Sequence, residues 1–561
     1  MNSVYYFVES LSLRTWFLSV WPRLLWRRFT SAPKVERCKV IDGSRLSMFF
    51  ARLSTRLFRV PIERLAFEFV EARDTAGVSV RLRILYDDLA RAQQYALDDP
   101  GFQALGRKGA LEGRLPIYLA KQMASTDLSD RSTVMRALSV IQVCVWKMRS
   151  VGHSYEPPVL FLERRPWLAA ISRYAREEGV TVVPVSPVKS VRSTVRHRLP
   201  PWATDMLRQG RNWLHVQRLK RGSARGTGEP AFQNRDGRRA ADAGSGPVQR
   251  REGPRVAVDY YGQLNLDHPE RHSDFSFWQQ SALEGSDLLV AFSIPRDPLD
   301  LQKLAELEGH GMEAVVLNPA ATTLPAGPIF KPRRRRNKPA RGLTGPQGVW
   351  IKEQTRKYQR MKAFWTDLAE SRNIKVYVTW FKYDATHCAI ADGLQAAGGV
   401  IGIYQRAYEV QPSVEATIGA DIVFGFSPAV ADIESRSDSV IRYHVAVGYL
   451  GDHRFPLLRE QAQTVRKAIQ QRGARHILAF FDENSSEDTR WLAGHHLMQK
   501  NYAFVLGKVL ENPWLGLVIK PKAPGNLRRR LGPVAELLER AEATGRCYVY
   551  QSGVLQGSHP P

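Results

Sequence analysis

Asp384 and His387 lie close together in a stretch whose residue types suit general-base chemistry, and Glu409 follows in the same part of the chain. An imidazole held near a carboxylate is a common base for removing the proton of a hydroxyl group. We therefore predict that His387, with Asp384 or Glu409 beside it, is the base of a catalytic site. A second interpretation stays open, in which Asp384 caps a helix and His387 is a partly exposed residue of its first turn.

A second group of polar residues suits the binding of a phosphate. Ser485 and Ser486 follow the apolar run RHILAFF, while Lys520 and Lys522 lie at the end of the apolar run LGLVIK and just after it. Serine hydroxyls and the backbone N–H groups that open a helix can donate hydrogen bonds to a pyrophosphate, and lysine adds compact positive charge. The alternative for the two lysines is an ordinary surface position.

Apolar runs of strand length, alternating with helical patterns, must position these residues. The central example is a β-branched and aromatic run at 374–379, a helix that starts near His387, and a strand at 400–404 that follows two glycines. Strands joined through a helix are parallel, and the loops after them gather at the carboxyl edge of the sheet, where ligands bind. We therefore expect both groups of polar residues at such edges.

Length and charge limit the class of protein. The 561 residues, 43% of them hydrophobic, are enough for two or three globular domains. The formal net charge of +26 indicates attraction to an acidic partner, such as nucleic acid, anionic lipid or a phosphate-bearing substrate. Much of this charge lies in tracts without the aromatic residues that stack on bases, which argues against nucleic acid as a partner.

The cysteines and the apolar runs indicate a compartment. Cys38, Cys144, Cys388 and Cys547 have neither the spacing of a zinc site nor that of a disulfide framework. No apolar run reaches the roughly 18–20 residues of a membrane span. We expect no metal, no cofactor and a cytoplasmic location. Residues 4–29 mix aromatic and basic side chains, which is typical of peripheral attachment to an anionic membrane surface on its inner face, or of a helix docked on the first domain.

Three regions follow from these patterns. Residues 1–150 are expected to be a mainly helical N-terminal region. Residues 151–455 are expected to form a Rossmann-like domain with disordered basic insertions near 220–254 and 322–347. Residues 456–561 are expected to form a second, partial Rossmann-like domain.

Three local motifs are similar to elements of the GT-B class of glycosyltransferases that build bacterial surface polysaccharide and lipopolysaccharide. They are VAVGYLGD at 445–452, FFDENS at 480–485 and LENPWLGLVIKPK at 510–522. The resemblance extends from Pro158 to the end of the chain. It implies an α/β fold of two Rossmann-like doubly wound domains, with a nucleotide-sugar donor held mainly by the second. It also implies a glycan or lipid-linked acceptor on the first.

In that class the donor-side domain continues for several more βα units, whereas this sequence ends after a third predicted strand. We therefore expect an incomplete domain. Either a partner completes it, or its truncation abolishes activity. Three alternatives stay open besides the glycosyltransferase: a polyol-phosphate transferase, a nucleotide-sugar epimerase of GT-B shape, and a non-catalytic membrane-associated scaffold.

Overall fold

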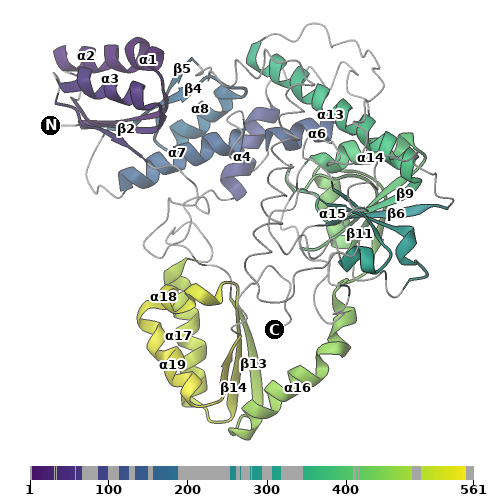
Figure 1. The fold of residues 1–561 in the computed structure, drawn as a ribbon. Helices are drawn as coiled ribbons and strands as arrows, with labels where there is room; N and C mark the ends of the chain where they lie inside the picture. The colour runs from purple at the N-terminus through teal and green to yellow at the C-terminus, as the bar shows by residue number, and fades with distance from the viewer. Residues whose placement is uncertain are drawn as a thin grey trace, which may run out of the picture. The chain divides into compact units, whose positions relative to one another are not determined.

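The computed structural model is an α/β protein with three parallel sheets (Figure 1), which confirms the predicted fold class at that level. The chain divides into two compact units, one of Met1–Ala96, Thr126–Val188 and Gly451–Pro561, the other of Leu97–Ser125 and Lys189–Leu450. We describe each unit, and each sheet, by itself. The structure describes residues 3–30, 32, 34–56, 59–65, 86–98, 113–124, 133–149, 156–186, 253–260, 266, 278, 281–292, 306–316, 345–383, 385–407, 412–414, 416–482, 485 and 494–550.

The first sheet has five parallel strands in the order β3-β2-β1-β4-β5. Its strands are β1 Ser3–Leu11, β2 Lys34–Gly43, β3 Ile62–Arg64, β4 Val159–Glu163 and β5 Thr181–Val185. The central strand β1 is buried along almost its whole length, because helices pack on the sheet and aromatic and β-branched side chains fill both of its faces. The strand order reverses beside β1, as in a doubly wound fold.

Helices of this unit surround the first sheet. They are α1 Leu13–Thr15, the π-helical segment η1 Trp16–Val20, α2 Trp21–Phe29, α3 Arg45–Thr55, α4 Tyr86–Leu97, α7 Val134–Arg149 and α8 Leu168–Glu177. Trp16, Val20 and Leu24 pack with β1 and β2 in one apolar core, together with Met48 and Ala51 of α3. One side of η1, α2 and α3 therefore packs on the sheet.

Residues 1–150 are mainly helical among those that the structure describes, and they also contain three strands that the sequence did not predict. These strands, β1 to β3, lie within the first 64 residues, together with α1, η1, α2 and α3. The aromatic run of β1 resembles a membrane-interface segment in isolation, and only pairing with β2 and β4 places it in a core. The expected boundary at residue 151 also differs, because β4 and β5 belong to this sheet and not to the next one.

The second sheet has seven parallel strands in the order β12-β11-β10-β9-β6-β7-β8. Its strands are β6 Arg255–Tyr260, β7 Leu288–Phe292, β8 Glu313–Val316, β9 Ile374–Thr379, β10 Val400–Tyr404, β11 Gly419–Gly425 and β12 Val440–Ala446. Its helical elements are α6 Leu115–Met123, η5 Gly285–Asp287, α13 Gly345–Arg372, α14 Thr386–Ala396 and α15 Pro428–Arg436. The order reverses between β6 and β9, which makes their carboxyl ends the switch point of the sheet.

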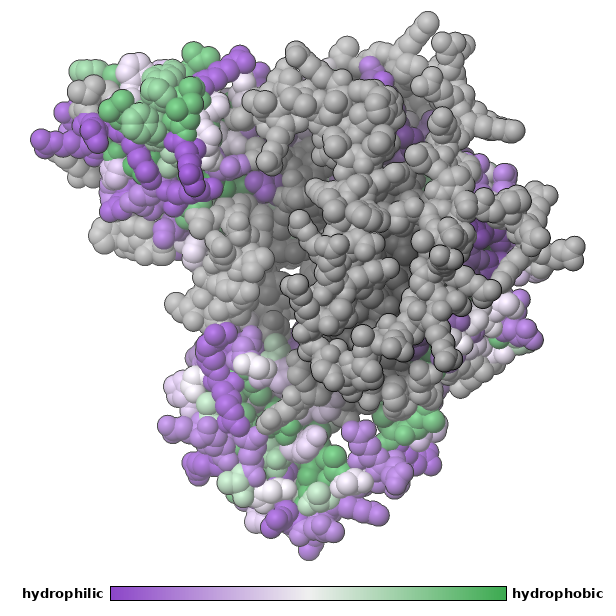
Figure 2. All heavy atoms as spheres, in the orientation of Figure 1, coloured by the Kyte–Doolittle hydropathy of each residue, from purple (hydrophilic) through white to green (hydrophobic). Residues whose placement is uncertain are grey.

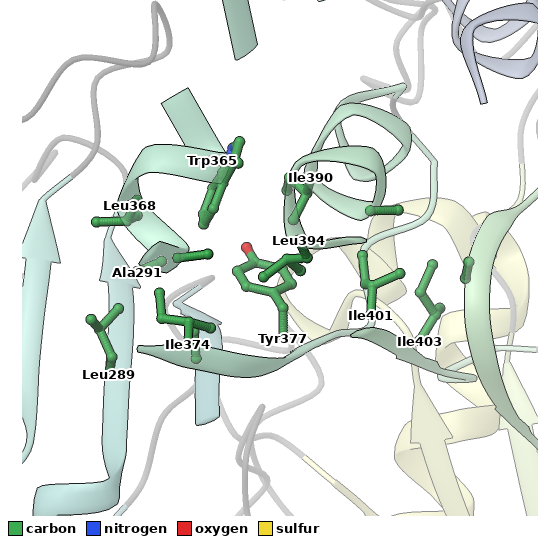
Figure 3. Packing of buried hydrophobic residues seen from close by; sticks show 14 of the residues in the cluster. Leu289, Ala291, Trp365, Leu368, Ile374, Tyr377, Ile390, Leu394, Ile401 and Ile403 are labelled. Carbon is green, nitrogen blue, oxygen red and sulfur yellow. The ribbon is translucent and has the colours of Figure 1, made fainter. Parts of the chain in front are cut away.

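One face of the second sheet is covered by α13 and α14, whose apolar side chains meet Tyr377 of β9 (Figure 3). The Trp365 and Tyr377 rings meet edge to face at 5.0 Å. Gly393 allows the two helices to approach closely, since a Cβ there would lie 2.8 Å from both the Lys362 carbonyl oxygen and the Trp365 Cβ. The predicted strand, helix and strand around His387 are therefore confirmed, and they form the centre of this unit.

The third sheet lies in the C-terminal segment and has three parallel strands in the order β13-β14-β15. Its strands are β13 His476–Asp482, β14 Leu515–Pro521 and β15 Cys547–Val549. Its helical elements are η6 Asp452–Arg454, α16 Phe455–Gln471, α17 His495–Glu511, η7 Pro524–Asn526, α18 Leu527–Leu531, η8 Gly532–Val534 and α19 Ala535–Ala543. α17, α18 and α19 pack on one face of the sheet (Figure 1).

Two further expectations concern the basic insertions and the membrane. The insertions predicted near 220–254 and 322–347 lie outside the described residues, except at 253–254 and at 345–347, where α13 begins. Among the helices that the structure describes, none combines the length and the apolar character needed to cross a bilayer.

All four cysteines are buried as free thiols. Burial raises the pKa of the Cys38 and Cys547 thiols to about 12, so neither forms a thiolate at neutral pH. We expect the native protein to react only slowly with a disulfide reagent at pH 8, and all four thiols to react once guanidinium unfolds the chain. Rapid labelling of Cys38 in the native protein would show that the first sheet opens readily.

Candidate functional site

His387, the predicted general base, lies in the interior. It is 1% exposed in the first turn of α14, and its Nε2 accepts a hydrogen bond from the backbone N–H of Gly419 at 3.2 Å. That bond occupies the lone pair that a general base would use at this nitrogen. In this arrangement His387 joins α14 to β11, and its role as a base stays a prediction. Its predicted partners Asp384 and Glu409 lie outside the described residues.

The polar residues around His387 belong to a buried ionic cluster that holds α6 against α14. The Arg114 guanidinium contacts the Asp392 carboxylate at 2.9 Å and the Asp421 carboxylate at 2.8 Å, and all three side chains are buried. Asp421 also accepts the backbone N–H of Ile401 at 3.0 Å, and the Tyr358 hydroxyl bonds to Asp392. The cluster is thereby internally paired, which favours a structural role.

The switch point of the second sheet collects aromatic and charged residues. Trp380 directly follows β9, and the Arg406 guanidinium lies 4.2 Å from the centre of its ring. Lys382 pairs with Glu434 of α15 at 3.2 Å, and both side chains are buried. The Glu434 carboxylate also lies 3.5 Å from His444 Nε2 on β12. The sequence reasoning missed this group, because its members come from β9, β10, α15 and β12.

The third sheet carries a second buried polar cluster at the carboxyl end of β13. Arg530 of α18 contacts Asp482 at 2.8 Å and donates to the Ser485 hydroxyl at 3.1 Å. The Ser485 Oγ lies 2.8 Å from Nδ1 of His495, the first residue of α17. Burial, followed by the nearby Asp482 carboxylate, raises the pKa of the Tyr502 hydroxyl, which stays protonated.

This cluster gives Ser485 a structural role, and its predicted contact with a phosphate stays a prediction. Its side chain is fully buried, and both of its observed partners are protein groups. Ser485 therefore fixes the loop after β13 between α18 and α17. Arg530 was missed by the sequence reasoning because it stands in a run of three arginines, Arg528 to Arg530, in which only the last is buried. Ser486 lies outside the described residues.

The two predicted lysines lie beside this cluster. Asp482 pairs in register with Pro521, so the chain that leaves β14 at Lys522 starts next to the chain that leaves β13 toward Ser485. Lys522 is exposed. Lys520 lies partly buried, with its Nζ 4.3 Å from the centre of the Tyr550 ring, and burial lowers the pKa of its ammonium group.

The structure thus brings Ser485, Lys520 and Lys522 to one sheet edge and adds Arg530 and His495 to them. Among the described residues, Lys522 gives this edge an exposed positive charge, and the opening turn of α17 adds partial positive charge from its N–H groups. Such an edge can hold an anion. Within the described ranges, no three His, Cys, Asp or Glu side chains are grouped closely enough to hold a metal ion.

The sequence matches no protein-family model and no curated protein. The edge formed by β13 and β14 and the switch point of the second sheet are two of the places, within the described residues, where polar groups gather after parallel strands.

Proposed function

We propose that this chain is a GT-B-like glycosyltransferase of bacterial surface-polysaccharide biosynthesis. It would transfer a sugar from a nucleotide-activated donor to a glycan or lipid-linked acceptor. The observation that carries this proposal is the cationic carboxyl edge of β13 and β14, where Lys520 and Lys522 lie beside the loop fixed by Arg530. The free cysteines support the cytoplasmic location that we assign to it.

The chemistry of a nucleotide sugar fits this edge. Its pyrophosphate carries two negative charges, which an exposed ammonium group such as Lys522 and the N–H groups of a helix start can neutralise. Arg530 is already committed to Asp482 and Ser485, so its role is to hold the loop in place. Lys520 is held against the Tyr550 ring, which orients its charge along the same edge.

The acceptor would lie at the switch point of the second sheet. Trp380, Phe381 and Tyr383 are partly exposed there and offer apolar ring faces to the C–H groups of a sugar. Arg406, stacked on Trp380, adds a cation that suits a phosphate of a lipid-linked acceptor.

A thermal-unfolding screen with nucleoside diphosphates tests the proposal. A nucleotide that binds only the folded chain stabilises it by about 2.7 kcal/mol at a hundred times its dissociation constant. We expect one member of a panel of uridine, cytidine and guanosine diphosphates to raise the unfolding temperature. Lys522→Ala should weaken the binding of that nucleotide about tenfold, because a hydrogen bond to a charged group contributes roughly 1.5–3 kcal/mol.

Lys500→Ala is the matched control, since Lys500 is an exposed lysine within α17, away from the opening turn of that helix. It should leave nucleotide affinity unchanged. If no diphosphate shifts the unfolding temperature at millimolar concentration, the transferase proposal fails, and the result favours a non-catalytic scaffold. If binding occurs and Lys522→Ala retains full affinity, the donor site lies elsewhere.

A further inference from the structure

Helix α3 has its large apolar side chains on the side that faces solvent. Its sheet-facing stripe consists of Ser47, Met48, Ala51 and Thr55, which are all buried and mostly small. The opposite stripe, at helical spacing, is exposed and consists of Leu46 (59% exposed), Phe49 (61%), Phe50 (37%) and Leu53 (48%). An amphipathic helix in a globular protein normally buries its large apolar stripe, so this face calls for a partner.

The neighbouring helices extend this apolar surface. The Trp16 indole donates a hydrogen bond to the Ser54 hydroxyl at 2.8 Å, which joins η1 to the end of α3. Exposed apolar side chains continue from there along α1, η1 and α2: Leu13, Phe17, Leu18, Trp26 and Phe29. In Figure 2 these residues contribute to the green area at the upper left, over the helices labelled α1 to α3 in Figure 1. We call the exposed apolar residues of α1, η1, α2 and α3 the N-terminal patch.

The charged residues within the helices that carry the N-terminal patch all have one sign. Exposed arginines are interspersed with it at six positions: Arg14, Arg23, Arg28, Arg45, Arg52 and Arg56. Residues 12–30 and 44–56 contain no aspartate or glutamate. A surface of this kind is attracted to an anionic layer, and each arginine near an anionic bilayer adds to the attraction.

The charge also argues against a second copy of the chain as the partner that covers the N-terminal patch. Two N-terminal patches facing each other would bring their arginines together without a carboxylate from the same helices to pair with them. An anionic bilayer has no such conflict, because phosphate groups accept the arginines while the aromatic rings enter the boundary of headgroups and acyl chains.

We propose that the N-terminal patch is the surface by which this protein lies on an anionic bilayer. α3 and α2 rest in the interface, with their apolar side chains among the headgroups and their arginines on lipid phosphates. The attachment is peripheral. This proposal does not depend on the transferase proposal. The membrane contact is made by α1, η1, α2 and α3. β1, which also lies within residues 4–29, is buried in the sheet and takes no part in it.

Flotation of the full-length protein with lipid vesicles tests this proposal. Vesicles of phosphatidylcholine with 30% phosphatidylglycerol, a composition chosen as about that of an anionic leaflet, should carry the protein upward. Vesicles of phosphatidylcholine alone should carry much less. Phe49→Glu/Leu53→Glu should reduce binding by on the order of tenfold or more, because it places two charges at the interface. Both side chains are exposed, so the variant should fold.

The matched control is Leu497→Glu/Phe504→Glu, which changes two similarly exposed apolar side chains of α17. It should float like the unmodified protein. The Arg45→Glu/Arg52→Glu variant should bind anionic vesicles more weakly, and its remaining binding should no longer depend on salt concentration. Equal binding by the Phe49/Leu53 variant, or equal binding to neutral vesicles, would overturn the proposal. So would a dimer in light scattering that Phe49→Glu/Leu53→Glu converts to monomer, since that result would identify a second copy as the occupant.

Discussion

Replacing Arg530 by methionine should destabilise the third sheet by about 3–5 kcal/mol, because the change leaves a buried carboxylate without its counter-charge. Arg530 and Asp482 are 1% and 0% exposed, and the guanidinium lies 2.8 Å from the carboxylate. Methionine keeps much of the apolar length of the side chain, so the loss measures mainly the charge and its hydrogen bonds. Ser485 and Asn526 each lose a bond to the same guanidinium.

Hydrogen exchange read by mass spectrometry should locate this effect. A loss of about 3 kcal/mol corresponds to exchange roughly a hundredfold faster in peptides that cover β13 and β14. Arg529→Met is the matched control, because the adjacent arginine is exposed, and it should leave exchange unchanged. Adding Asp482→Asn to Arg530→Met should recover part of the protection, since the uncompensated charge is then gone. No change in the single variant would show that water already reaches Asp482.

Replacing Arg114 by methionine should have a comparable or larger effect on the second unit, because one guanidinium neutralises two buried carboxylates. Its contacts with Asp392 and Asp421 span 2.9 Å and 2.8 Å, and these carboxylates are 6% and 3% exposed. We expect a loss of about 3–5 kcal/mol or more. Exchange should rise in peptides covering α14 and β10, whose Ile401 N–H depends on Asp421.

Arg372→Met gives the comparison for this second prediction. Arg372 pairs with Glu313 at 2.6 Å, but its side chain is 36% exposed, and solvent screens such a pair. It should therefore change exchange little. If Arg114→Met behaves in the same way, the buried cluster contributes less than its geometry indicates, and α6 is held by its apolar contacts alone.

Local pattern was enough to predict the elements around His387. The β-branched run predicted at 374–379 is β9, and the run at 400–404 is β10. The helix between them ends at Ala396, and Gly398 follows with a φ of 74°, which suits glycine in the left-handed region. These features depend on neighbouring residues only, so the sequence contains them, and the parallel pairing follows from the helical connection.

The same local reasoning did not predict β1, and it did not predict that His387 is buried. An aromatic run is compatible with a membrane interface or with a sheet centre, and only β2 and β4, which pair with β1, distinguish the two. The imidazole of His387 is compatible with catalysis or with packing. Its role follows from Gly419, 32 positions away, whose N–H occupies Nε2.

Strand-length apolar runs separated by helical patterns are enough to predict an α/β protein with parallel sheets, because a helical connection brings the next strand back in the same direction. Which charged residues are buried depends on the packing of distant elements. Arg114 pairs with Asp392 and Asp421, which lie 278 and 307 positions further along the chain. Arg530 is buried, whereas Arg528 and Arg529 are not, because α18 packs with the Arg530 side toward the sheet. The tertiary structure also decides that α3 turns its small residues inward and its large apolar ones outward. Whether a side chain is buried depends on which distant elements pack against it, and the local spacing of residues does not contain that information.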